Sequence, residues 1–117
     1  MKKIYVCSRY AGETDENVKK AREYCGFVAK ICGAIPVAPH IYFTQFLDDE
    51  DERERDCGLG LGLHALRHCD EFLLVVIDGI ISEGMRAEIA EVSRLGMPGR
   101  IITLTRKEFI QRIKKAR

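Results

Sequence analysis

The segment CDEFLLVVIDGIISEGMRAEIAE, residues 69–91, decides the fold. Residues 72–77 are six apolar residues in succession and are rich in β-branched types, which is typical of a central parallel strand covered on both faces. A short turn follows, and Ser82 is a favourable N-cap for a helix that runs to about Leu95 and carries Glu88 in its second turn. The segment therefore predicts one strand–turn–helix unit of an α/β protein.

The rest of the chain alternates between strand and helix patterns in the same way. Three further strands are expected at residues 3–7, 35–38 and 100–104, and three further helices at residues 14–32, at residues 51–68 and from Thr105 onward. Right-handed crossovers then predict a small flavodoxin-like or Rossmann-like three-layer sandwich with a parallel sheet of four to five strands. The expected strand order is 2-1-3-4, and residues 39–49 are expected to form a loop.

Composition indicates one soluble, globular domain over residues 1–117. Apolar residues make up 46% and charged residues 32% of the chain, and a net charge of +1 gives no basis for binding a nucleic acid polymer or a membrane. No segment approaches the roughly 20 apolar residues of a membrane span, and the first apolar run is too short for a signal peptide.

The five cysteines contain no CxxC pair and suggest no disulfide framework, so a cytoplasmic location is expected. Four of them stand in apolar surroundings and are expected to pack as small hydrophobic residues: Cys7, Cys25, Cys32 and Cys69.

Two loops are expected to meet at the carboxyl ends of the first and third strands. In open α/β sheets, ligands bind at that edge, where the strand order reverses and helix N-termini present backbone N–H groups. The loop after the first strand is SRYAG, residues 8–12, and the loop after the third is DGIISEG, residues 78–84. These two loops predict a crevice that binds a ligand.

Three pieces of the chain resemble the nucleoside 2-deoxyribosyltransferase-like superfamily, which includes the 2'-deoxynucleoside 5'-monophosphate N-glycosidases. IYVCS at residues 4–8, with residues 9–12 after it, is similar to the first strand and substrate loop of that superfamily. CDEFLL at residues 69–74 is similar to a segment in which an aspartate precedes an apolar strand. GMRAEI at residues 84–89 is similar to the Gly-x-x-x-Glu helix that carries the nucleophile. The resemblance extends over about residues 4–98.

The resemblance implies an N-glycosidase or deoxyribosyltransferase that acts on a small nucleoside or nucleotide. Glu88 would attack the anomeric carbon, Asp70 would support the site or contact the sugar, and Tyr5 would position the nucleophile. Ser82 stands where the monophosphate glycosidases have serine and the transferases aspartate, which favours a phosphorylated substrate. The implied contacts to substrate or phosphate are Ser8, Arg9, Gly12, Ser82, Gly84 and Met85. The implied chemistry requires no metal and no organic cofactor.

Part of the chain departs from the pattern of that superfamily. Residues 39–56, PHIYFTQFLDDEDERERD, do not match its base-binding segment. The transferases complete their site with a C-terminal carboxylate from a neighbouring subunit, and the tail of this chain has no counterpart to it. The same crevice could therefore bind a nucleotide without turning it over.

Several motifs also have a purely structural interpretation. Glu88 would then be a solvated helix residue, Ser82 only an N-cap, and Asp70 the residue before a strand. His64 and His68 lie one helical turn apart and could share a metal ion, which would indicate a metal-dependent hydrolase, although no third ligand is suitably spaced.

Residues 41–47, IYFTQFL, are too apolar for an exposed loop. We expect this aromatic segment to cover the active site or an interface in a homodimer or higher homo-oligomer. His40, just before it, could reach the crevice. Gly58, Gly60 and Gly62 alternate with leucine and would allow a close helix contact.

Overall fold

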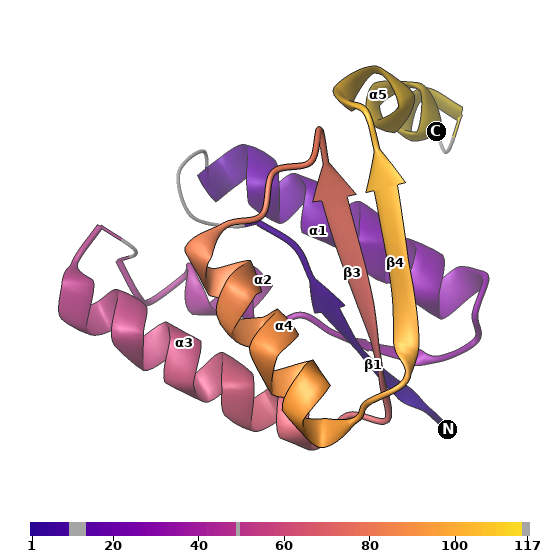
Figure 1. Cartoon of the computed structure of the whole chain (residues 1–117). Coiled ribbons are helices and arrows are strands. Elements are labelled where there is room, and N and C mark those ends of the chain that lie inside the picture. Colours follow the sequence, from indigo (N-terminus) through magenta and orange to yellow (C-terminus); the bar gives the residue numbers. More distant parts are fainter. Residues whose placement is uncertain (10–13, 49, 116–117) are drawn as a thin grey trace.

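Strand β1, Lys3–Cys7, is an inner strand of a four-stranded parallel sheet. The computed structural model describes residues 1–9, 14–48 and 50–115 of the chain (Figure 1). The other strands are β2, Ile35–Val37; β3, Glu71–Ile77; and β4, Gly99–Leu104. The helices are α1, Thr14–Lys30; α2, Pro39–Phe43; α3, Glu52–Arg67; α4, Glu83–Leu95; and α5, Arg106–Lys115.

The strand order is β2-β1-β3-β4, which confirms the expected order 2-1-3-4. Tyr5 of β1 is paired with Val37 of β2 on one side and with Phe72 of β3 on the other. The first and third strands are therefore neighbours, and the order of the sheet reverses between them.

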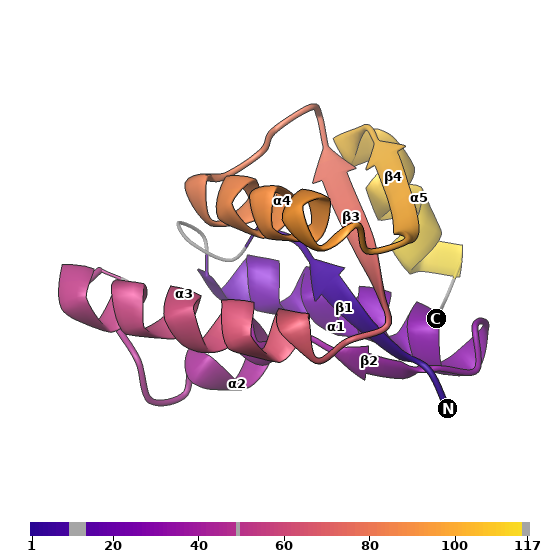
Figure 2. The ribbon, with the colours of Figure 1, turned by 60° about the horizontal axis from the view of Figure 1, so that its bottom comes forward.

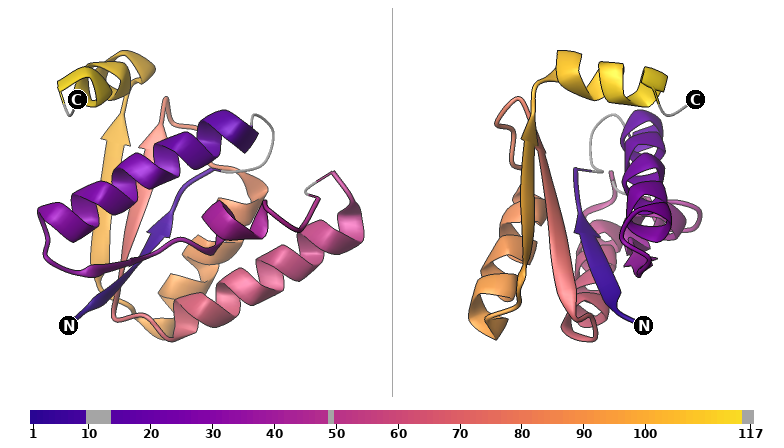
Figure 3. Two further views of the ribbon diagram at one scale, coloured as in Figure 1. Left: turned by 180° about the vertical axis from the view of Figure 1, so that it is seen from behind. Right: turned by 90° about the vertical axis from the view of Figure 1, so that its right-hand side faces the viewer.

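Helices cover both faces of the sheet, so the molecule has the three layers expected of this α/β class (Figures 2 and 3). On one face, Val28 of α1 is buried against β1 and β3. On the other face, α3 and α4 contact each other and bury Leu66 and Met85 against the same strands. None of the helices in the described part of the chain has both the length and the apolar character needed to cross a lipid bilayer.

The last helix lies across the carboxyl end of the sheet instead of along its face. Figure 3 shows α5 extending from the end of β4 toward α1. The ring of Phe109 on α5 meets the ring of Tyr24 on α1 with the ring centroids 5.6 Å apart, and the ammonium group of Lys20 lies 5.4 Å from the centre of the Phe109 ring. This contact brings the first turns of α5 to the same end of the sheet as the loop after β1.

Side chains alternate along β1 between the two cores. Ile4 and Val6 belong to the core under α1, whereas Tyr5 and Cys7 belong to the core under α3 and α4. The alternation follows from the period of two of an extended strand, and β1 is buried on both faces because it is an inner strand. Tyr5 therefore brings a hydroxyl group into the core under α3 and α4.

The helix starts follow the capping signals of the sequence. Asp51 caps α3, and the Ser82 hydroxyl caps α4 by accepting a 3.2 Å hydrogen bond from the backbone N–H of Met85. Thr105 and Glu108 form a capping box before α5, each side chain accepting a 3.1 Å hydrogen bond from the backbone N–H of the other residue.

Two expectations about the surface are wrong. Residues 39–43 form the short helix α2 instead of a loop, because Pro39 at the first helical position has a suitable φ and needs no hydrogen-bond partner for its nitrogen. Cys32 is exposed and not packed, because α1 ends at Lys30 before its last apolar turn can reach the core.

We predict that Gly99→Ala destabilises the fold and Gly26→Ala does not. A Cβ atom at Gly99 would lie 2.3 Å from the backbone oxygen of Phe72, so the β3–β4 pairing would have to shift at a cost of roughly 1–3 kcal/mol. A Cβ at Gly26, inside α1, meets no atom within 4 Å, so alanine should add about 0.5–1 kcal/mol of helix stability. Urea unfolding of both variants measures the difference, and equal stability would contradict the close β3–β4 contact.

Candidate functional site

The candidate site is built around a buried carboxyl group on α4. Met85, Glu88 and Val92 have the spacing that places side chains on one face of a helix, and all three are buried against the sheet. Glu88 is only 8% exposed although its side chain is ionisable. Its carboxyl group accepts a hydrogen bond from the hydroxyl group of Tyr5, which is 2% exposed. An acidic group is thus held inside the core beneath α3 and α4.

Burial decides the protonation of this pair. It raises the pKa of the Glu88 carboxyl from its ordinary 4.5 to about 7, and the hydrogen bond from Tyr5 opposes part of that rise. The pKa of the Tyr5 hydroxyl is raised far above its ordinary value, first by burial and then by the nearby charge of Glu88. Tyr5 therefore remains a neutral donor, while Glu88 changes between acid and carboxylate near neutral pH.

Glycine in α3 makes room for the Tyr5 hydroxyl. Gly62 is buried, and a Cβ atom there would lie 3.2 Å from the Tyr5 oxygen. Gly62 therefore allows the Tyr5 side chain of β1 to approach α3 closely. Gly60 of the same helix is exposed, and a Cβ there would meet nothing within 4 Å.

A small cavity of about 20 Å³ lies next to Glu88. Besides Tyr5 and Glu88, its lining includes Gly84 of α4, Gly62 of α3, and His40 and Phe43 of α2. A volume of this size is enough for about one water molecule.

His40 and Ser8 connect this cavity to a second one. The Ser8 Oγ and the His40 Nε2 share a buried hydrogen bond of 3.3 Å. Burial lowers the pKa of His40 from 6.5 to about 4, so the imidazole is neutral near pH 7. His40 lines the cavity at Glu88, whereas Ser8 lines the neighbouring cavity at the end of β1.

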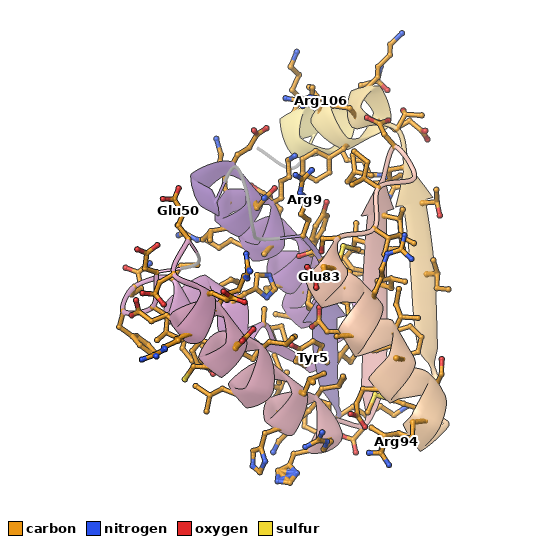
Figure 4. All side chains as sticks on the ribbon, turned by 60° about the vertical axis from the view of Figure 1, so that its left-hand side comes forward. Tyr5, Arg9, Glu50, Glu83, Arg94 and Arg106 are labelled. Atoms are coloured by element: carbon orange, nitrogen blue, oxygen red, sulfur yellow. The ribbon has the colours of Figure 1, made fainter. Side chains whose placement is uncertain are left out.

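The second cavity, which we call the cationic cavity, has a volume of about 90 Å³. Figure 4 shows Arg106 and Arg9 at the same end of the sheet, with Tyr5 deeper in the molecule. The polar residues that line the cavity are Ser8, Arg9, Asn17, Lys20, Tyr24, Asp78 and Arg106, and Met85 contributes to its apolar lining. Asp78 has a positive φ of 52°, and its carboxylate accepts a 2.9 Å hydrogen bond from the backbone N–H of Arg106.

The structure places the predicted site residues in three groups. Tyr5, Gly84 and Glu88 line the small cavity. Ser8, Arg9 and Met85 line the cationic cavity. Ser82 caps α4 and lines neither cavity, and Gly12 lies outside the described residues.

Asp70 is not brought to the site, so the expectation that it supports catalysis needs correction. It is exposed at the amino end of β3, where its carboxylate accepts a 2.9 Å hydrogen bond from the backbone N–H of Lys3. The two cavities lie toward the other end of these strands. The side chain ties the starts of β1 and β3 together.

Sequence patterns gave no indication of Lys20 and Arg106 in the cationic cavity. Lys20 lies on α1 and Arg106 opens α5, and the packing of Phe109 against α1 and the ion pairs of both cations with Glu16 bring them together. Arg106 lies two residues after the end of β4 at Leu104, and this position alone did not single it out.

The remaining candidates lie on the surface. His64 on α3 and His68 just after its end are exposed, with their ring centres 4.7 Å apart. In the described ranges, no group of three histidine, cysteine, aspartate or glutamate side chains is arranged to hold a metal ion.

In the aromatic segment, Phe43 lines the Glu88 cavity, whereas Tyr42 and Phe46 are 53% and 62% exposed. The homodimer stays a prediction.

We predict that Glu88→Gln stabilises the fold increasingly as the pH rises. The pKa of Glu88 is about 7 in the folded protein, above its ordinary 4.5. As the pH rises between these two values, Glu88 ionises more readily in the unfolded chain than in the folded one, so the free energy of unfolding falls. Glutamine keeps the shape and an acceptor for Tyr5 but does not ionise. Its advantage in unfolding free energy should grow by about 2–3 kcal/mol from pH 5 to pH 8. Urea unfolding of both proteins at both pH values tests this, and a constant difference would show that Glu88 does not titrate there.

Comparison with solved structures supports the fold. One match is a 2-deoxyribosyltransferase of the psychrotolerant bacterium Bacillus psychrosaccharolyticus, described as a biocatalyst for the synthesis of nucleosides. The two chains are 20% identical with a TM-score of 0.63, over 86% of this chain and 72% of the transferase. This match is consistent with the fold that the sequence resemblance implied.

Comparison of sequences identifies a family. No curated protein matches this chain in sequence. One family, described as a domain of unknown function and designated DUF7768, has a sequence model that matches residues 2–102. Because that match covers most of its length, the chain belongs to the DUF7768 family.

Proposed function

We propose that this chain breaks or transfers the N-glycosidic bond of a nucleoside or nucleotide, with Glu88 as the nucleophile. The observation that carries the proposal is the buried Glu88 carboxyl, which the Tyr5 hydroxyl holds beside a cavity. The similarity in fold to a 2-deoxyribosyltransferase supports the same reaction class. Tyr5 would be the positioning residue of this site.

The proposed reaction has two steps. The Glu88 carboxylate forms a bond to the anomeric carbon, the bond from that carbon to the base breaks, and its electron pair leaves with the base nitrogen, which takes up a proton. Water or a second base then attacks the anomeric carbon and releases the Glu88 carboxylate. A carboxylate in a dry site suits the positive charge that develops on the sugar ring.

The raised pKa of Glu88 is compatible with this role. Near pH 7 the carboxyl group is divided between its two protonation states. Positive charge that develops on the sugar ring favours the ionised form, and the hydrogen bond from Tyr5 also stabilises it. The substrate itself would thus help to create the nucleophile.

Substrate access requires movement around the small cavity. A volume of about 20 Å³ cannot hold a sugar ring, so side chains must move before one can reach Glu88. Phe43 is the large side chain of α2 in the lining, and it belongs to the aromatic segment whose other rings reach the surface. We infer that this segment opens to admit the ligand and that a second copy of the chain covers it in a homodimer.

A second candidate function is binding of a nucleotide without turnover. Glycosidases commonly use two carboxyl groups at the scissile bond. Among the described residues that line the small cavity, Glu88 supplies the one carboxyl group, and Asp70 lies elsewhere. A binding module needs no second acid, so this observation favours the alternative.

We predict that the parent protein releases free base from a 2'-deoxynucleoside or its 5'-monophosphate and that Glu88→Gln does not. Removing the nucleophile should reduce the rate by roughly a thousandfold or more. Glu83→Gln is the matched control, because Glu83 lies on the same helix but is exposed. Chromatography of each substrate after incubation measures the release. Equal activity in the parent and Glu88→Gln would exclude Glu88 as the nucleophile, and ligand binding without any release would favour the binding module.

We predict that Gly62→Ala lowers turnover and Gly60→Ala does not. The added methyl group at position 62 presses on the Tyr5 hydroxyl and displaces the partner of Glu88, which should slow the reaction by roughly tenfold to a hundredfold. The methyl group at position 60 points into open space on the same helix. Initial rates and urea unfolding of both variants separate a local effect from loss of fold. Equal rates would show that the position of the Tyr5 hydroxyl does not matter for catalysis.

A further inference from the structure

We propose that a groove at the amino end of the sheet binds a small amphipathic carboxylate, that is, an apolar body that carries one carboxylate group. The groove lies between the end of α1 and the starts of β3 and β4, and its lining includes Phe27, Ile31, Leu73 and Arg100. We call it the α1–β4 groove. It is separate from the two cavities near Glu88, which lie toward the carboxyl ends of the strands. The proposal goes beyond the glycosidase function and does not depend on it.

The α1–β4 groove is large enough for a small organic molecule. Its volume is about 540 Å³, against about 20 Å³ and 90 Å³ for the two cavities at the other end of the sheet. Small-molecule sites commonly have volumes of roughly 300–1,000 Å³. Helix α5 lies across the carboxyl end of the sheet, and none of its described residues lines the groove (Figure 3). The helix that follows β4 therefore leaves this space open to a ligand.

The floor and one rim of the groove are apolar. Ile4, Val28 and Leu73 form the floor and belong to the core under α1. On the rim at the end of α1, Phe27 and Ile31 are 38% and 72% exposed. A ligand that excludes water from such side chains gains about 25 cal/mol for each Å² of apolar surface that it buries. The groove therefore favours a ligand with an apolar body.

The opposite rim carries an excess of positive charge. Arg100 is paired with Leu73 in the β3–β4 register, so the two side chains extend on the same face of the sheet. Lys2 and Glu71 also line the groove and form a 2.9 Å salt bridge with each other.

In the part of the chain that the structure describes, Arg100 forms no ion pair. The side chains of the lining comprise two cations and one carboxylate, which leaves one positive charge in excess. A guanidinium group binds a carboxylate with two parallel hydrogen bonds, so Arg100 supplies the contact for an anionic head group.

Binding of octanoate to the full chain tests the proposal, with octan-1-ol as the matched uncharged probe. Titration calorimetry below the micelle concentration should give a dissociation constant for octanoate below about 1 mM. Arg100→Gln should weaken octanoate binding by about tenfold and change octanol binding by less than about twofold. Phe27→Ala should weaken the binding of both probes by about fivefold or more, because it removes apolar contact. Arg112→Gln is the matched control, since Arg112 is exposed on α5 and does not line the groove.

Two exposed cysteines allow the binding site to be located. Cys32 lines the groove, whereas Cys57 is exposed on α3 and does not line it. Bound octanoate should slow the alkylation of Cys32 by iodoacetamide and leave the alkylation of Cys57 unchanged. Mass spectrometry of the alkylated protein measures both rates.

The variants and the cysteines together make the test decisive. Absence of octanoate binding, equal weakening by Arg100→Gln and Arg112→Gln, or equal protection of both cysteines would each overturn the proposal. Ile31→Ser should also weaken both probes, and it replaces a side chain that is 72% exposed, so it serves if Phe27→Ala folds poorly. Protection of Cys32 that increases with protein concentration without any ligand would show that a second copy of the chain fills the groove, and would likewise overturn the ligand site.

Discussion

The alternation of side chains along β1 is the constraint on which the candidate site depends. In an inner strand with helices on both faces, successive side chains enter opposite cores, and residues 4–7 of β1 are all buried in one of the two cores. Because side chains alternate along the strand, Ile4 and Val6 point toward α1 and Tyr5 points toward α3 and α4. A shift of one residue in the pairing of β1 would move the phenol to the wrong layer and leave Glu88 without its donor. The register of the sheet thus controls the protonation of a group on a helix.

The buried Tyr5–Glu88 pair works against the stability of the fold. An apolar side chain at position 88 would fit the sequence pattern of α4, where Met85 and Val92 occupy the same face. Position 88 instead carries a buried carboxyl group whose ionisation is costly. The hydrogen bond from Tyr5 offsets only part of that cost. Such groups are common at functional sites, because a reactive protonation state requires surroundings that resist it.

Local patterns were sufficient to predict the strand order and the Ser82 cap of α4. The strands were visible as apolar runs, and the caps as short polar signals at helix starts. The role expected of Asp70 rested on a short motif, yet a residue that precedes a parallel strand must lie at the amino edge, away from ligands. The contributions of Lys20 and Arg106 were beyond such reasoning, because they arise from α5 folding over α1. That contact depends on one aromatic ring, Phe109, whose partner is 85 positions earlier in the chain.

The family match ends at residue 102, and α5 begins at Arg106. The strands and helices that hold Tyr5 and Glu88 therefore lie within the matched residues, whereas the arginine that opens α5 lies beyond them. Changes in α5 would alter the charge at the mouth of the site without disturbing the sheet. The charge at this end of the sheet is therefore set in part by a residue outside the matched region, while the buried Tyr5–Glu88 pair lies inside it.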